Sequence, residues 1–328
     1  MDGNHADRCW PGNFRRPRCD LIEAVLSGDP AAVGYLLGWR VVRWLPAPIA
    51  RALFTFGADL ASGGGRGMEQ LRANLTRVVG AENVTRDLVR ASVRSYARYW
   101  LEAFRLPVLA KRRDLLAELA PNVVGLRTLD AAVASPRGLI LVLPHSGNWD
   151  MAGLLMVQRY GSFTTVAERL KPEVLYDAFV RFRTTLGFEV LPLTGGPPPF
   201  PILRDRLQSG GIVCLMGERD LKHTGVTVNF FGESARMPSG AVRLARDTGA
   251  ALHVAHSYFT SDGWGFSVSD EIIVGEDIDA AVQKMADIFA ANIAAYPADW
   301  HMLQPQWNAD LDADRLARGL QRKAGQSQ

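Results

Sequence analysis

The spacing of apolar positions along this chain changes near residue 121. Before that point, residues 66–80 and 85–105 show patterns that predict helices. After it, short apolar runs alternate with helical segments. Strands are predicted at 138–143, 163–167, 188–191, 212–216, 226–230, 251–258 and 265–273. Helices are predicted near 151–160, 173–186, 200–209, 239–248 and 278–295.

Such alternation predicts an α/β fold, with a mostly parallel central sheet flanked by helices. The chain has 328 residues, of which 48% are hydrophobic, which is enough for one large core with a helical appendage. We expect this domain to span residues 66–310. A flexible leader over 1–30 and a flexible tail over 311–328 are expected to flank the rest of the chain.

Aromatic residues and arginines alternate between Tyr35 and Leu60, and Pro46 and Pro48 divide this segment into two helices. Tryptophan beside arginine on short amphipathic helices is typical of a segment that lies on an anionic membrane surface. A helical pair packed on the core explains the same pattern, so both interpretations stay open. Because no run reaches the ~18 uninterrupted apolar residues of a spanning helix, we predict that residues 31–65 associate with the membrane peripherally.

The small net charge of +3 and the absence of a basic tract give no indication of nucleic-acid binding. Cys9, Cys19 and Cys214 do not form a disulfide framework, and no zinc-ligand spacing is present, so no metal site is predicted. Cys214 lies within an apolar run and is expected to be a buried, inert thiol. A reducing cytoplasm fits these cysteines best.

His145 directly follows an apolar predicted strand, in the segment Leu143-Pro144-His145-Ser146-Gly147-Asn148-Trp149-Asp150. Ligands of α/β sheets bind beyond the carboxyl ends of strands. Across this strand–turn–helix junction, Asp150 can approach the imidazole and fix its tautomer. Alternatively, Asp150 serves backbone amides in the first turn of the helix. A lone histidine at a strand end is more often structural, so this segment needs further support.

A second charged cluster, Gly217-Glu218-Arg219-Asp220, follows the predicted strand 212–216. Three consecutive charges at a strand end are unfavourable unless they face a cleft or a partner. Glu218 can pair with His145 as a second orienting carboxylate. Arg219 and Asp220 can equally pair with each other at the surface.

Arginines near a predicted helix start form a further candidate site. Arg236-Met237-Pro238-Ser239-Gly240 is predicted to open a helix, and Arg243 lies on it. A helix start with arginines is suited to the phosphate groups of a cofactor, although each arginine can equally be a solvated surface residue. Because no Gly-x-Ser-x-Gly elbow and no cysteine in an electropositive setting appear, direct attack by a substrate hydroxyl with histidine as general base is favoured.

The chain resembles the bacterial lipid A biosynthesis (lauroyl/myristoyl) acyltransferases, whose signature is a His, four residues and then Asp or Glu. His145 and Asp150 match that signature. The resemblance covers roughly residues 30–310. It includes Val228-Asn229-Phe230-Phe231-Gly232, Pro238-Ser239-Gly240-Ala241-Val242-Arg243-Leu244-Ala245-Arg246 and Trp300-His301-Met302-Leu303-Gln304-Pro305-Gln306-Trp307. Within the family, Gly217-Glu218-Arg219-Asp220 and the first helices are similar to those of the actinobacterial phosphatidylinositol mannoside acyltransferases.

This resemblance implies transfer of a long-chain acyl group, palmitoyl being expected, from acyl-CoA to a mannose hydroxyl of phosphatidylinositol mannosides. Acyl-CoA would be a substrate, no cofactor is implied, and the enzyme would act at the cytoplasmic face of the plasma membrane. His145 would be the base, with Glu218 and Asp150 as candidate orienting carboxylates. Glu168 and Arg183 match family positions near the acceptor. The predicted substrate-binding residues are Glu168, Arg183, Arg219, Asp220, Arg236, Ser239 and Arg243.

Other functions stay open at this point. The lipid A enzymes usually end in a basic His-Arg-Arg-type segment, whereas this chain has Leu303-Gln304-Pro305-Gln306-Trp307, which indicates a different acceptor. Glycerol-phosphate acyltransferases share the His-x4-Asp signature but usually carry a Phe-Pro-Glu-Gly block that is absent here. Another lipid acceptor, lipid A-like or a lysophospholipid, and a non-catalytic lipid-binding protein are the remaining alternatives.

Overall fold

The computed structural model describes residues 30–112, 114–169, 173–220 and 224–311. The leader expected over 1–30 and the tail expected over 311–328 lie outside these residues, apart from Pro30 and Leu311. Cys9 and Cys19 fall in the same undescribed part of the chain.

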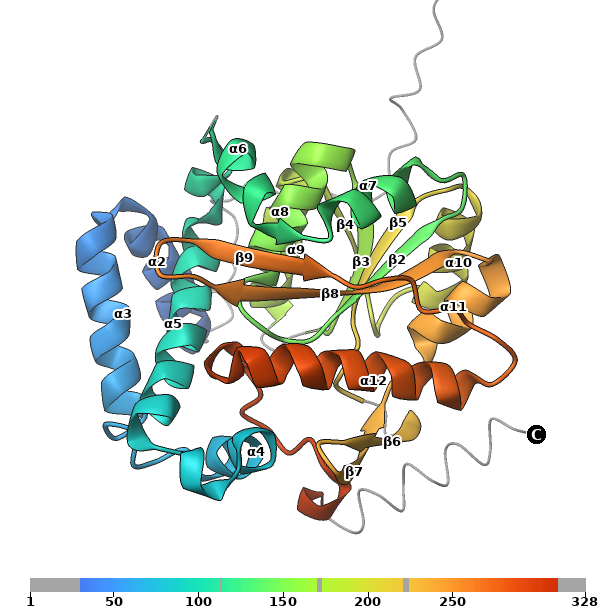
Figure 1. Ribbon diagram of the computed structural model, residues 1–328. Helices are drawn as coiled ribbons and strands as arrows, with labels where there is room; N and C mark the ends of the chain where they lie inside the picture. Colours follow the sequence, from blue (N-terminus) through green and yellow to red (C-terminus); the bar gives the residue numbers. More distant parts are fainter. Residues whose placement is uncertain (1–29, 113, 170–172, 221–223, 312–328) are drawn as a thin grey trace, which may run out of the picture.

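A seven-stranded sheet forms the centre of the molecule, in the order β1-β9-β8-β2-β5-β3-β4 (Figure 1). Its strands are β1 (Val123–Val124), β2 (Leu139–Leu143), β3 (Phe163–Ala167), β4 (Phe188–Pro192), β5 (Ile212–Met216), β8 (Ala251–Phe259) and β9 (Trp264–Val268). Every neighbouring pair is parallel except β8 and β9. The predicted mostly parallel α/β sheet is therefore confirmed.

Helices cover both faces of this sheet because its strands are apolar on both sides. In β2, Ile140 and Val142 pack in one core cluster with α10 (Pro199–Gln208), α11 (Gly240–Thr248) and α12 (Ile278–Ala295). Leu139, Leu141 and Leu143 alternate with them and pack on the opposite face. That face is covered by α7 (Leu126–Ala134), α8 (Trp149–Tyr160) and α9 (Glu173–Thr185).

Helices α2 (Pro30–Trp44), α3 (Ala47–Ala61) and α5 (Arg86–Leu109) gather beside one end of the sheet, to the left in Figure 1. The break at Pro46 follows the prediction. Arg105 of α5 reinforces it by donating to the carbonyls of Val42 and Leu45 at the carboxyl end of α2. Trp39 packs into the core against Phe104 and two aromatic rings of α9. In the described part of the chain, no helix has the length and apolar character needed to cross a membrane.

The region around Arg236 differs from the prediction. Strands β6 (Val226–Phe230) and β7 (Glu233–Met237) form an antiparallel hairpin, so Arg236 lies in a strand, and the next helix begins only at Gly240. The turn consists of Phe231 and Gly232, both with positive φ, which is the geometry of a tight hairpin turn. Because Phe-Gly is not a usual hairpin-turn pair, the sequence contained no clear signal for β7.

The other differences are small. Strand β9 ends at Val268 rather than at the predicted 273, because the Ser269 hydroxyl takes the hydrogen bond of the Val254 amide. The remaining short elements are α4 (Glu69–Val79), α6 (Leu115–Leu119), η1 (Ala81–Asn83), η2 (Ala120–Asn122), η3 (Pro297–Asp299) and η4 (Asn308–Asp310). Strand β1 and helices α6 and α7 were not predicted.

Candidate active site

The pairing of β2 with β5 brings His145 and Glu218 together. The two strands are parallel and adjacent, with Leu143 opposite Met216. His145 and Glu218 each lie two residues beyond that pair, at the same edge of the sheet. The Gly217 amide continues the ladder by donating to the Leu143 carbonyl at 2.9 Å. The two polar segments that the sequence placed after separate strands are therefore neighbours.

Glu218 holds the His145 ring through one oxygen. Its Oε1 accepts hydrogen bonds from the backbone N–H of His145 at 2.7 Å and from Nδ1 at 2.7 Å. Because an ionised carboxylate only accepts, this bond assigns the imidazole proton to Nδ1 and leaves the Nε2 lone pair free in the neutral ring. Glu218 is fully buried, whereas the His145 side chain is 31% exposed. Only the imidazole is therefore accessible to a substrate.

The turn after His145 is fixed by two residues. Gly147 has φ of +55°, and a Cβ there would lie 2.5 Å from the Ser257 backbone, so no other residue fits. Asn148 caps α8 by accepting the Met151 amide at 3.0 Å, and its Nδ2 donates to the buried Glu102 at 2.7 Å. The histidine is therefore held on a rigid strand–turn–helix junction.

Asp150 binds partners other than the His145 ring. Its carboxylate accepts from Arg183 Nε at 2.9 Å and Nη2 at 3.1 Å, and from the Tyr99 hydroxyl at 3.0 Å. Burial works against the Arg183 charge, yet Asp150 raises the pKa of that guanidinium above its ordinary value. Burial, together with Asp150, raises the pKa of Tyr99 well above its usual value, so Tyr99 remains a donor. The hypothesis that Asp150 orients the imidazole is therefore corrected: Glu218 contacts the ring, and Asp150 holds Arg183.

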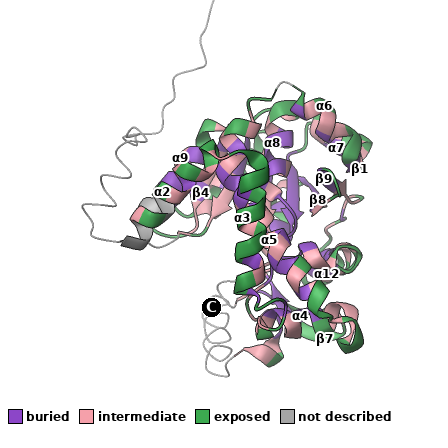
Figure 2. Cartoon of the chain, turned by 90° about the vertical axis from the view of Figure 1, so that its left-hand side faces the viewer, coloured by how far each residue is buried: buried purple, intermediate pink, exposed green. Residues whose placement is uncertain are grey.

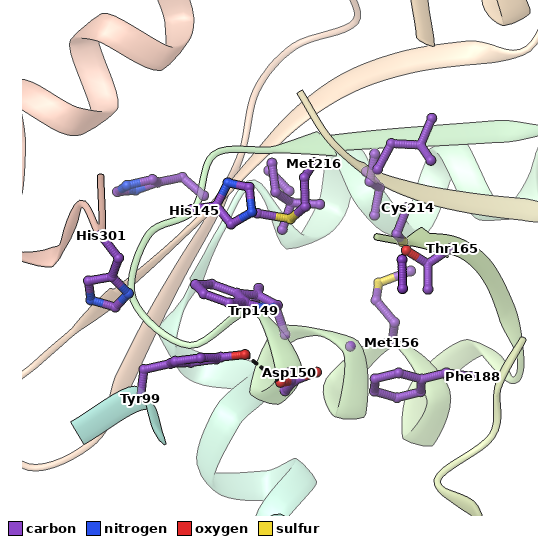
Figure 3. Close-up of a pocket in the computed structure, with 18 of the residues that line it drawn as sticks. Tyr99, His145, Trp149, Asp150, Met156, Thr165, Phe188, Cys214, Met216 and His301 are labelled. Atoms are coloured by element: carbon purple, nitrogen blue, oxygen red, sulfur yellow. Dashed lines mark hydrogen bonds between the residues drawn. The ribbon is translucent and has the colours of Figure 1, made fainter. Parts of the chain in front are cut away.

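A cavity of ≈ 410 Å³ opens beside His145. It lies between the sheet and α8, and its lining is mostly apolar. Figure 3 shows His301 and Tyr99 on one side of it, and Met156, Thr165, Phe188 and Cys214 on the other. Burial raises the pKa of the Cys214 thiol to about 12, so it remains protonated, as expected of an inert thiol.

The predicted substrate-binding residues fall into two groups. Glu168, Arg183 and Arg219 line the cavity, and Arg219 also binds the side chain of Gln304. The others lie away from its walls: Asp220, Arg236, Ser239 and Arg243.

The second group makes local bonds instead. Asp220 accepts the Gly225 amide at 2.6 Å, and Arg236 donates to the Gly225 carbonyl at 3.0 Å. Ser239 accepts from Arg243 at 3.1 Å on the surface of α11. Arg219 and Asp220 thus bind different residues, and the anion site expected around the start of α11 is not part of this cavity.

Two further histidines in the cavity wall were not predicted as site residues. His301 contacts the Ser95 hydroxyl through Nε2 at 2.9 Å, and Ser95 donates to Asp299 at 2.7 Å. Since the Ser95 proton goes to Asp299, His301 carries its own proton on Nε2, which leaves Nδ1 as an acceptor. That Nδ1 is buried and has no partner. Burial and, secondarily, the neighbouring His145 lower the pKa of His301 to about 3, so this ring is neutral.

His256 is the other histidine, and its Nε2 lies 3.0 Å from the Ser146 hydroxyl. Burial lowers the pKa of His256 to about 4. His301 lies in the terminal block that carries the family resemblance, but no local pattern marked either histidine. Only the folded chain brings them beside His145.

Comparison with known proteins identifies the family of the chain. The family model described as bacterial lipid A biosynthesis acyltransferase matches residues 31–309. The chain is 55% identical over 297 residues to a phosphatidylinositol mannoside acyltransferase of Mycolicibacterium smegmatis, covering 89% of this chain and 96% of that protein. It is 54% identical over 288 residues to a protein of the same name from Mycobacterium tuberculosis, covering 87% and 90%. The chain therefore belongs to the bacterial lipid A biosynthesis acyltransferase family.

Proposed function

We propose that this protein transfers a long-chain fatty acyl group, such as palmitoyl, from acyl-CoA to a mannose hydroxyl of phosphatidylinositol mannosides. The observation that carries the proposal is the Glu218-bound imidazole of His145 at an otherwise mostly apolar cavity. The names of the relatives from Mycolicibacterium smegmatis and Mycobacterium tuberculosis support the acceptor class.

The chemistry follows from the state of the His145 ring. Nε2 removes the proton of the acceptor hydroxyl as its oxygen attacks the thioester carbonyl carbon. Buried Glu218 stabilises the imidazolium that forms and keeps Nδ1 protonated. The tetrahedral intermediate then expels the CoA thiolate, which takes the proton from Nε2. An ester and free CoA result, and no covalent intermediate on the protein is needed.

The apolar part of the cavity supports a long-chain donor. A ~16-carbon chain has roughly 12 kcal/mol of gross transfer free energy, at ~0.8 kcal/mol per methylene and before ordering costs. Binding of the tail can therefore position the thioester beside His145, so that short donors lose rate as well as affinity.

The polar side of the cavity supports a hydroxyl-rich acceptor. Arg183 is held rigidly by Asp150, and Glu168 lies exposed at the cavity rim. Cationic and anionic groups so placed can bind the hydroxyl and phosphate groups of a glycolipid headgroup. His301 lines the cavity as well, as a neutral polar ring.

We place the protein at the cytoplasmic face of the plasma membrane, as a peripheral protein bound to anionic lipid. The support is a row of exposed apolar side chains spaced at helical intervals on α2 and α3: Leu37, Val41, Trp44, Ile49, Leu53, Phe56 and Leu60. Figure 2 shows much of the surface of α3 as exposed. Arg43 and Arg51 are exposed on the same helices and can meet anionic headgroups.

The test is turnover of radiolabelled palmitoyl-CoA by the purified chain, with phosphatidylinositol mannosides, a lysophospholipid and a lipid A precursor offered in parallel. We expect label in the mannosides, with mass spectrometry placing the ester on mannose. Faster labelling of either other acceptor would contradict the acceptor assignment. Stoichiometric binding of palmitoyl-CoA without ester formation would instead indicate a non-catalytic lipid-binding protein.

A further inference from the structure

Two phenylalanine rings bound the cavity at the edge of the sheet farthest from His145. Phe163 opens β3 and Phe188 opens β4, and the parallel register places them opposite each other. Their ring centroids are 4.7 Å apart, both side chains are buried, and both line the cavity. The parallel register places Phe163 level with Leu139, six residues before His145, so the rings lie roughly 20 Å from His145 along the strand direction, at ~3.3 Å per residue.

Gly153 of α8 gives these rings their space. A Cβ at this position would lie 2.7 Å from Cζ of Phe188 and 3.1 Å from Cζ of Phe163. Glycine inside a helix costs roughly 1 kcal/mol relative to alanine, and one that is buried under two aromatic rings has an evident packing reason. Any other residue at 153 would therefore displace the rings.

Mostly apolar side chains lead from His145 to this wall. Met216 lies beside His145, and Cys214, Thr165 and Met156 follow in the direction of Phe188 (Figure 3). Cavity-lining residues from β1, α7 and β9, such as Leu129, form a second apolar part of the lining. The route along β5 and β3 is the one that ends against two packed rings.

We propose that Gly153, Phe163 and Phe188 form the end wall that sets the longest acyl chain accepted by the cavity. This inference rests on the proposed function, since it assigns the tail of the acyl donor to the space between β3, β5 and α8. Phe188 is the specificity-determining residue, because its ring tip fills the place vacated by the missing side chain of Gly153.

The experiment measures kcat/KM for a homologous series of saturated acyl-CoA donors. Phe188→Leu shortens the wall and should raise the preference for longer donors about tenfold or more, since one methylene in an apolar pocket changes kcat/KM by roughly 10- to 200-fold. Gly153→Ala should push the ring inward and shift the preference toward shorter donors. The double variant should return toward the wild-type preference, which a mere loss of packing would not do.

Controls separate the possible outcomes. Phe230→Leu removes a buried ring outside the cavity and should lower stability with the donor preference unchanged. An unchanged preference in an active Phe188→Leu protein would overturn the inference, as would a shift produced by Leu129→Ala instead. If the wild-type protein forms no ester at all, the proposed function fails. In that case, the rise in Tm that each acyl-CoA produces on binding measures the preferred chain length without turnover. An unchanged preference in the Phe188→Leu protein would again overturn the inference.

Discussion

Two carboxylates near His145 make different bonds. Glu218 accepts the Nδ1 proton of the imidazole, whereas both oxygens of Asp150 bind Arg183 and one also accepts from Tyr99. A guanidinium with little contact to water needs such a partner, because an uncompensated buried charge is strongly destabilising. In the proposed mechanism, Glu218 therefore acts on the base His145, whereas Asp150 holds Arg183 in position.

Amide substitutions distinguish these roles. Asp150→Asn leaves Arg183 without its counter-charge, so we expect a loss of about 3–5 kcal/mol in the free energy of unfolding. That loss corresponds to a fall in Tm of roughly 6 °C or more for a chain of this size. Thermal unfolding followed by circular dichroism measures it. A Tm equal to that of the wild type would contradict the structural role of this ion pair.

Glu218→Gln removes the charge that stabilises the imidazolium in the proposed mechanism. We expect it to lower kcat by about 10²-fold or more, since a neutral amide supports neither the tautomer nor the developing charge. Steady-state kinetics at saturating donor and acceptor measure this, with Asp150→Asn as the matched amide variant that leaves the ring bond intact. Retention of more than about a tenth of the wild-type kcat would contradict the role of Glu218.

The sequence predicted the spatial neighbours of a residue best where both residues follow predicted parallel strands. His145 and Glu218 each follow an apolar strand, and a parallel sheet collects such strand ends at one edge. Tyr99 and His301 come from a long helix and a terminal loop, so only tertiary packing reveals that they reach the cavity. Asp150 was placed correctly in the helix's first turn, but its partner Arg183 lies on another helix, where spacing along the chain is uninformative.

Among the elements, α2 and α3 show the packing on the core that one interpretation of their sequence predicted, and their association with a membrane stays a prediction. The side chain of Trp39 faces the core and packs on Phe179 and Phe182, whereas Trp44 is 89% exposed. The helices therefore pack on the domain along one side and present an apolar stripe on the other. An exposed stripe of this extent indicates an interaction surface rather than scattered apolar residues.

Membrane binding by this stripe can be tested with charges. Changing Trp44, Leu53 and Phe56 together to Glu should reduce partition onto anionic vesicles by about 10²-fold or more, because each buried side chain contributes roughly 1.5–3 kcal/mol. Co-sedimentation measures the partition. The control is Ile273→Glu, which charges a comparably exposed apolar residue elsewhere. Equal partition of the triple variant and the wild type would leave α2 and α3 as packing helices only.

Elements were predictable where apolar runs were long. Strands β2 and β5 are apolar throughout, and their bounds in the structure are nearly the predicted ones. Strand β7, Glu233–Met237, has polar residues at several positions, and its extended conformation is stabilised by hydrogen bonding to β6. Strand β1 has only two residues, so its pairing with β9 depends on long-range contacts that no local pattern contains.

At the scale of the whole molecule, buried histidines couple the fold to pH. Burial lowers the pKa of His256 to about 4 and that of His301 to about 3, against ~6.5 in the unfolded chain. Between these values the unfolded state binds more protons, so stability is complete above about pH 6.5 and falls as the pH decreases. Burial raises the pKa of Asp299, which acts in the opposite sense around its own, more acidic range.

A single substitution measures this coupling. Each buried histidine contributes a slope of about 1 kcal/mol per pH unit to the free energy of unfolding between roughly pH 5 and 6. His256→Gln should reduce the wild-type slope by that amount, whatever its effect on absolute stability. Chemical denaturation across this pH range gives both slopes. Identical slopes would show that His256 does not remain neutral in the folded protein.

The most direct test of the proposed mechanism is single-turnover acyl transfer by His145→Ala, with palmitoyl-CoA and phosphatidylinositol mannosides at saturating concentrations. The variant should fold as the wild type does, which its circular dichroism and Tm establish, because the His145 side chain is partly exposed. Loss of the general base should lower the rate by about two to four orders of magnitude. A folded His145→Ala protein that retains more than about a tenth of the wild-type rate would contradict the assignment of His145 as the base.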